Sequence, residues 1–362
     1  LEKFAIVAFS PILLNLCLIF AIMFLTDYTK TPAHALSIGV TMAGITQFLW
    51  LVYSCRRVEA LPSLLAPKLT EHVRKMLKLI APAALGAGVA QINLFIDLIF
   101  ASDFKDGVSY LYYADRMNEL PLGVIGIAVS TALLPTLSKQ IRMGDMNAAY
   151  HSMNRAIELV TLFALPAAIA LITIPEPIIK VMYQHGQFTA SDTIATYRAM
   201  VAFAVGLPSF VLIKIFASGF YASENTRTPF IVATICVVLN LCLNLILMQF
   251  LQHVGLALAT SIAGWFNAIT LGILLHKRKL LIADHALKRR VPRMFAANVV
   301  MVGVLIPAHY ALTNWLNASL TMQIIALCLL IGSGLASYGI AIIGFRAVDR
   351  GTLKTYLRRS KR

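Results

Sequence analysis

The chain has 362 residues, of which 59% are apolar and 13% are charged, and its mean hydropathy is +0.78. Soluble domains contain about 45–50% apolar and about 25% charged residues, so this composition excludes an ordinary soluble enzyme, a disordered chain and a disulfide-rich scaffold. We therefore expect an all-α integral membrane protein. Its net charge is +15. In a chain this apolar, we interpret the excess of Lys and Arg as the charge bias of cytoplasmic loops, and we expect no nucleic-acid partner.

Ten stretches are long and apolar enough to cross a bilayer core of roughly 30 Å as helices. In chain order, the predicted spans are 6–25, 36–55, 79–101, 108–137, 154–174, 194–221, 230–251, 254–275, 294–314 and 322–345.

Lysines and arginines alternate between the connecting segments. Most of them follow the second, fourth, sixth, eighth and tenth spans, whereas the opposite segments hold Lys30, Lys105 and Lys180. By the positive-inside rule, the basic segments and the C-terminus are cytoplasmic. The basic cluster at 288–293 is also suited to anionic lipid headgroups, which makes membrane lipids an expected partner.

An internal repeat relates the first two spans to two later ones. Residues 14–18 read LNLCL and match residues 239–243, which read the same, and residues 35–44 align with 255–264. A six-helix repeat in parallel orientation is a transporter architecture, with the substrate path between two lobes. We accordingly expect residues 1–60 to be the last two helices of an incomplete N-terminal lobe. Residues 61–280 would form a complete six-helix lobe, and residues 281–362 two additional helices with a basic cytoplasmic tail.

Charged side chains lie in the middle of the fourth span. Arg116 and Glu119 share a helix face, Asp115 is adjacent, and Pro121 interrupts the helix. A guanidinium is suited to bidentate recognition of phosphate, so we favour an arginine that contacts an anion in a wet cavity. The alternative is a structural Arg–Glu pair.

A second polar group combines one carboxylate with several neutral oxygens. It consists of Asp97, Asn240, Asn244, Thr260 and the backbone of Leu256. This donor set suits a monovalent cation such as Na⁺ better than Mg²⁺ or Ca²⁺. The alternative is that the asparagines join the helices by hydrogen bonds.

Lys214 lies near the middle of the sixth span. It either lines the same cavity as Arg116 or pairs with a carboxylate of the third or fourth span. Nucleotide-binding motifs and histidine pairs at metal-binding spacing are absent from the sequence, so we expect no other cofactor.

The fourth span carries a recognisable pattern. Tyr112-Tyr113-Ala114-Asp115-Arg116, then Glu119-Leu120-Pro121 and Gly123-Val124-Ile125-Gly126, and finally 133–138 (LLPTLS), resemble the signature helix of the MurJ (MviN) family. These proteins are bacterial lipid II flippases of the multidrug/oligosaccharidyl-lipid/polysaccharide exporter superfamily. Supporting matches lie at 9–11, 14–15, 184–188, 219–221 and 226–229.

The resemblance implies a function, a place in the cell and a partner. Family members have fourteen helices, and this chain resembles helices five to fourteen. The implied substrate is lipid II, the undecaprenyl pyrophosphate-linked peptidoglycan precursor. It would be moved from the inner to the outer leaflet of the bacterial cytoplasmic membrane by alternating access. Cell-wall synthesis proteins are further expected partners.

The resemblance also implies roles for individual residues. Arg116 would contact the pyrophosphate, with Asp115 and Glu119 as its neighbours. The last two helices would form a groove for the lipid tail. Asp97, Asn240, Asn244, Leu256 and Thr260 would form a sodium site, although relatives carry a carboxylate where this chain has Asn244. Alternative functions are another polysaccharide-lipid or drug exporter of this superfamily, or an integral-membrane enzyme acting on lipid-linked precursors.

Overall fold

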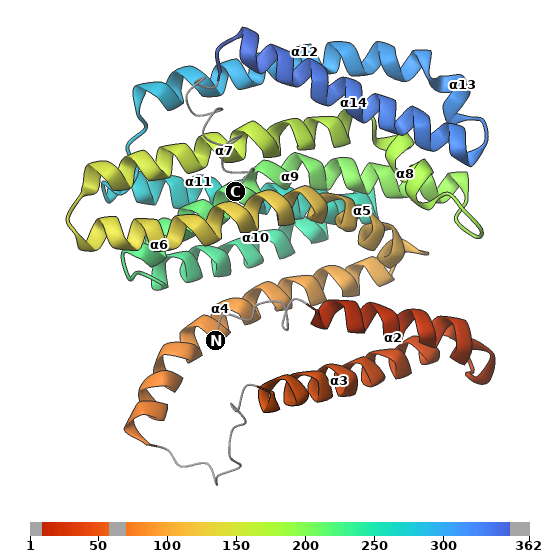
Figure 1. Ribbon diagram of the computed structural model, residues 1–362, viewed down its shortest axis with the longest axis horizontal. Coiled ribbons are helices and arrows are strands. Elements are labelled where there is room, and N and C mark those ends of the chain that lie inside the picture. Colours follow the sequence, from red (N-terminus) through yellow and green to blue (C-terminus); the bar gives the residue numbers. More distant parts are fainter. Residues whose placement is uncertain (1–8, 58–69, 348–362) are drawn as a thin grey trace. The chain divides into compact units, whose positions relative to one another are not determined.

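The structure, a computed structural model, describes residues 9–57 and 70–347, which form helices joined by turns and loops, with no strand (Figure 1). The chain divides into two compact units, Leu1–Arg74 and Lys75–Arg362. The predicted boundary between residues 60 and 61 lies outside the described residues.

The first unit is a pair of antiparallel helices. α2 (Ser10–Leu25) is followed by a 3₁₀ turn (Thr26–Tyr28) and by α3 (Pro32–Arg56). A Cβ on Gly39 would lie 2.7 Å from the Ala21 Cβ, so a glycine is required for the two backbones to approach this closely. These helices contain the described parts of the first two predicted spans, and residues 6–8 lie outside the described residues.

The second unit contains the remaining helices, apart from the first four residues of α4. They are α4 (Glu71–Ser102), α5 (Gly107–Pro121), a π-helical segment η2 (Leu122–Ile127), α6 (Ala128–Arg142), α7 (Met146–Thr173), α8 (Pro175–Tyr183), α9 (Ala190–Ala222), α10 (Arg227–Leu251), α11 (His253–Lys277), α12 (His285–Ala311), α13 (Thr313–Leu316) and α14 (Leu320–Gly344).

Eight helices in the described part are long and apolar enough to cross a membrane, and they coincide with eight of the predicted spans. The other two predictions fall in α4 and in the α5–α6 segment. The predicted span 108–137 falls in α5, the π-helical segment and α6, which follow one another without a break, and the α-helix changes to π geometry after Pro121, where the sequence predicted an interruption. Proline lacks the N–H that an α-helix needs, and the chain adjusts its hydrogen bonding there.

α9 is the central helix of the second unit and packs against α5, α6, α7 and α11. Small residues allow α9 and α11 to lie close together. A Cβ on Gly206 would be 2.5 Å from the Ser261 Oγ, and that hydroxyl donates to the Ala202 carbonyl over 2.6 Å. The same two helices contribute Phe203, Leu256 and Thr260 to the lining of a cavity.

α12 and α14 form an antiparallel pair that lies along α7 (Figure 1). Of the glycines on α14, Gly334 faces Leu305 of α12 at 3.1 Å from an added Cβ, whereas Gly332, Gly339 and Gly344 face open space. The Tyr338 hydroxyl donates to the Leu162 carbonyl over 2.8 Å and attaches α14 to α7.

Candidate functional site

Arg116 projects from α5 six residues before the helix changes to π geometry at Leu122. Its Nη1 lies 2.6 Å from the Glu119 Oε2, and the two side chains are 50% and 47% exposed. The guanidinium carbon also lies 4.8 Å from the centre of the Tyr112 ring. The Arg116–Glu119 pair, which was the alternative to an anion-contacting arginine, therefore forms, and both of its side chains are about half exposed.

Asp115 points to a different place from its neighbour Arg116. It lines a cavity of about 220 Å³ between α4, α5, α9 and α11, together with polar and aromatic residues that include Asn93, Asp97, Tyr112 and Thr260. Asp115 thus belongs to the same cavity as Asp97. The sequence placed these two carboxylates in separate groups.

The Asp97 carboxylate is surrounded by hydrogen-bond donors from three helices. Asn244 Nδ2 donates to Oδ1 over 2.6 Å, and Thr260 Oγ1 and Asn93 Nδ2 lie 3.3 Å and 3.4 Å from Oδ2. Both asparagines of α10, Asn240 and Asn244, are buried. These residues, with Asn240, are called the Asp97 cluster below.

Asn240 completes the Asp97 cluster. With its amide nitrogen turned toward α4, it donates to Asn93 Oδ1 over 3.0 Å and to Asp97 Oδ1 over 3.2 Å, and its oxygen accepts from the Thr260 hydroxyl over 3.2 Å. The Thr260 hydroxyl also lies 3.1 Å from the Leu256 carbonyl. The structure therefore brings together all five residues that the sequence grouped here.

One buried acceptor in the cluster has no hydrogen-bond donor. Asn244 Oδ1 is buried and unpartnered in the described part of the chain. Sequence reasoning missed Asn93, although its position four residues before Asp97 on one helix face was a usable signal.

Lys214 of α9 lies beside the π-helical segment. A Cβ on Gly126 would be 3.2 Å from the Lys214 Cδ and 3.4 Å from its Nζ. The residues that line the cavity at Asp97 do not include Lys214. The four ion pairs of the described residues do not join Lys214 to a carboxylate either.

An apolar crevice of about 510 Å³ opens between α7, α9, α11 and α12. Leu165, Leu212, Trp265 and Phe295 are among its walls, and Lys288 lies at the end where α12 begins. α14 contributes no lining residue, so this crevice differs from the expected groove between the last two helices.

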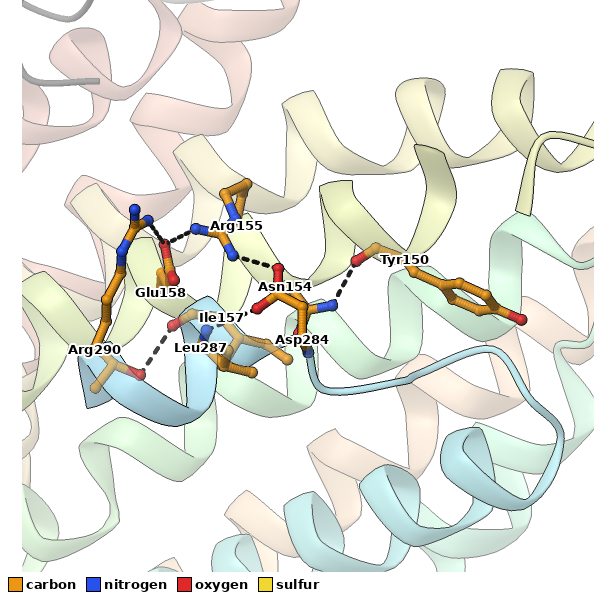
Figure 2. A network of polar contacts seen from close by, with 9 residues as sticks. Tyr150, Asn154, Arg155, Ile157, Glu158, Asp284, Leu287 and Arg290 are labelled. Atoms are coloured by element: carbon orange, nitrogen blue, oxygen red, sulfur yellow. Dashed lines mark hydrogen bonds and ion pairs between the residues drawn. The ribbon is translucent and has the colours of Figure 1, made fainter. Parts of the chain in front are cut away.

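A polar network fastens the start of α12 to α7 (Figure 2). Arg155 pairs with Glu158 one turn away and, over 2.6 Å, with Asp284, while Arg290 pairs with Glu158 over 3.0 Å. Asn154 donates to the carbonyl of Ile282 over 2.7 Å. The sequence indicated a topological role for these arginines, and anionic lipid headgroups as ligands for Arg290, but not these ion pairs, because their partners are far away along the chain.

Asp284 caps α12 as well as pairing with Arg155. Burial raises the pKa of Asp284, but the hydrogen bond from the Leu287 amide and the charge of the Arg155 guanidinium outweigh it, so the pKa is below its ordinary value. The carboxylate is therefore ionised at neutral pH and holds one wall of the crevice in place.

The family model for lipid II flippase MurJ matches residues 1–326. The chain belongs to the MurJ family of lipid II flippases. A probable lipid II flippase MurJ of Rhizobium meliloti is 37% identical over 99% of this chain and 68% of its own length. One from Rhizobium tropici is 36% identical over 100% of this chain and 69% of its own length.

A solved structure of lipid II flippase MurJ in an inward closed conformation agrees with the fold. It has a TM-score of 0.74 and 28% identity, covering 94% of this chain and 67% of that one. The family prediction is thus confirmed, as are the helical membrane fold and the transporter class, because the relatives are named as flippases rather than as enzymes.

Proposed function

We propose that this chain takes part in moving lipid II from the inner to the outer leaflet of the bacterial cytoplasmic membrane. The observation that carries the proposal is the half-exposed Arg116–Glu119 pair, in a chain whose relatives are named lipid II flippases. An exposed guanidinium can exchange one carboxylate for a phosphate without first being brought out of a buried ion pair.

The pair supplies a binding and release step. A pyrophosphate oxygen would replace Glu119 at the Arg116 N–H groups, and Glu119 would recover the guanidinium when the headgroup leaves. Exposed ion pairs of this type contribute only about 0–1 kcal/mol, so the exchange is energetically easy in both directions. Alternating access between two lobes, with residues 61–280 forming the complete C-terminal lobe, would present Arg116 to each side in turn.

The Asp97 cluster would hold a monovalent cation, for which Na⁺ is the proposed candidate. The oxygens of Asp97, Asn240, Asn244 and Thr260 and the Leu256 carbonyl are hard donors with a single negative charge among them. The unpartnered Asn244 Oδ1 is an acceptor that a cation would satisfy. A bound cation would supply positive charge beside the carboxylate.

The apolar crevice is our candidate for the prenyl tail. Its walls are aliphatic and aromatic, and Lys288 lies at its end. Under the proposed orientation, in which the C-terminus and the 277–293 segment face the cytoplasm, that end is near the inner-leaflet headgroups. Val291→Trp, which fills the crevice, is expected to weaken lipid II binding.

The deciding experiment is depletion of the chromosomal flippase and complementation with the full-length gene. Arg116→Ala is expected to fail to restore lipid II at the outer leaflet, and Arg116→Lys to restore it weakly because an ammonium cannot make the bidentate contact. Arg142→Ala is the matched control, because Arg142 donates only to the Ser138 carbonyl in the described structure. Normal translocation by Arg116→Ala would overturn the proposed role.

A further inference from the structure

Tyr112 lies between the Arg116–Glu119 pair and the cavity of the Asp97 cluster. Two stripes of residues run along α5 from this position. Tyr112, Arg116 and Glu119 follow one another at spacings of four and three, and the Arg116 guanidinium lies 4.8 Å from the Tyr112 ring. Val108, Tyr112 and Asp115 form the other stripe and line the cavity that contains Asp97 and Thr260. The two helix faces share Tyr112.

The surroundings of the ring show how it could move. Tyr112 is 56% exposed, so core packing does not fix it. Its neighbour Tyr113 is held in place by rings from another part of the chain, with centroids 4.7 Å from Tyr183 and 5.6 Å from Phe188. The Tyr112 ring meets the Tyr113 ring edge-on at a centroid distance of 5.9 Å and is otherwise largely exposed, so it is less constrained than Tyr113.

We propose that Tyr112 is a positioning residue that couples the occupancy of the Asp97 cluster to the binding of phosphate by Arg116. The inference rests on the proposed function. A guanidinium stacked on a ring keeps its edge N–H groups free for a bidentate phosphate, so the position of the ring sets the direction in which Arg116 presents them. When the wall of the cavity changes, the Tyr112 ring changes the orientation of the guanidinium.

The sign of the coupling follows from charge, and the Tyr112 ring sets most of its size: direct attraction between the two ligands, screened by solvent, is the part below about twofold that Tyr112→Leu would leave. A cation held at Asp97 neutralises a carboxylate on the Tyr112 side of Arg116, and a phosphate at Arg116 brings negative charge to the same region. Each ligand thus favours the other, and thermodynamic linkage requires the effect to be equal in both directions. We expect lipid II to bind about fivefold more tightly with Na⁺ than without it.

The test is a binding cycle on the purified chain in nanodiscs. Lipid II affinity is measured in NaCl and in choline chloride at equal ionic strength, so that screening is constant. The ratio of the two affinities is expected to remain about fivefold in Tyr112→Phe, which keeps the ring, and to fall below about twofold in Tyr112→Leu. Tyr310→Leu removes another exposed tyrosine, on α12, and is expected to leave the ratio unchanged.

The outcomes separate this inference from the proposed function. If Tyr112→Leu keeps the wild-type ratio, the coupling does not pass through Tyr112 and the inference is overturned. If Arg116→Ala keeps that ratio, the coupling does not reach the phosphate contact, which also overturns it. If the wild type binds lipid II equally tightly in both salts, Na⁺ and lipid II are not coupled and the inference is overturned. The proposed function is tested separately, by the complementation experiment with Arg116→Ala.

Discussion

Asn244 donates its amide nitrogen to the Asp97 carboxylate over 2.6 Å and thereby joins α10 to α4. The acceptor in this bond is the Asp97 carboxylate, the one negatively charged group of the cluster, and the donor is a neutral amide. The amide oxygen of Asn244 has no hydrogen-bond donor. An aspartate at position 244 would have two acceptor oxygens and no N–H donor. It would therefore lose the hydrogen bond that joins α10 to α4 and gain an oxygen that can bind a cation.

Asn244→Asp is expected to make the stability of the chain depend more strongly on Na⁺ than that of the wild type, whose proposed cation site has one carboxylate. Two carboxylates at this distance repel each other unless a cation or a proton lies between them, and a second carboxylate raises cation affinity, here by about tenfold. The melting temperature of the variant should rise on replacing choline with Na⁺, because a ligand that binds only the folded state stabilises it. Asn244→Ala, which adds no charge, is the control. Equal melting temperatures of Asn244→Asp in both salts would contradict a cation site here.

Glu119→Gln is expected to tighten lipid II binding while slowing its transport. The carboxylate competes with phosphate for Arg116, and its removal leaves the guanidinium with a weaker partner. Because both side chains are about half exposed, the gain should be only about two- to fivefold in affinity. Binding in nanodiscs and turnover in a translocation assay measure the two effects separately. Weaker binding by Glu119→Gln would indicate that Glu119 orients Arg116 instead of competing for it.

The sequence predicted the helices better than the contacts between them. Long apolar stretches reveal spans such as 230–251 directly, and the positions of Asp97 and Asn244 on their helices could be read from spacing and family resemblance. The position of Asp115 in the cavity of Asp97 could not, because it depends on how α4 and α5 are rotated against each other. Likewise, Arg155 and Asp284 are 129 residues apart, and only the packing of α12 on α7 brings them together.

Gly206→Ala is expected to destabilise the second unit by about 1–3 kcal/mol. The added methyl group would lie 2.5 Å from the Ser261 Oγ and 2.9 Å from the Ser261 Cα, so α9 and α11 would have to separate. Gly303→Ala on α12 is the control, because an added Cβ meets nothing within 4 Å there. The control should be neutral or stabilising, since alanine favours helices. Thermal unfolding of both variants in nanodiscs measures the difference, and equal melting temperatures would show that the two helices can move apart without cost.

Asp284→Asn is expected to lower stability at neutral pH by about 1 kcal/mol or less, and by progressively less in acid. Asparagine can still cap α12, so the substitution removes the charge that faces Arg155 while keeping the cap. The folded state holds the pKa of Asp284 below its ordinary value, so the carboxylate contributes stability above about pH 4. That contribution is lost as the pH falls through the lowered pKa.

The measurement is thermal unfolding of wild type and Asp284→Asn in nanodiscs between about pH 3 and pH 7, where the difference between them should shrink toward the acid end. Asp145→Asn is the matched control, since Asp145 caps α7 through the Ala148 amide over 2.9 Å and is not part of an ion pair in the described residues. A difference for Asp284→Asn that stays constant across this range would mean that the network at the start of α12 gains nothing from the charge of Asp284. The crevice wall would then depend on the Arg290–Glu158 contact and on apolar packing.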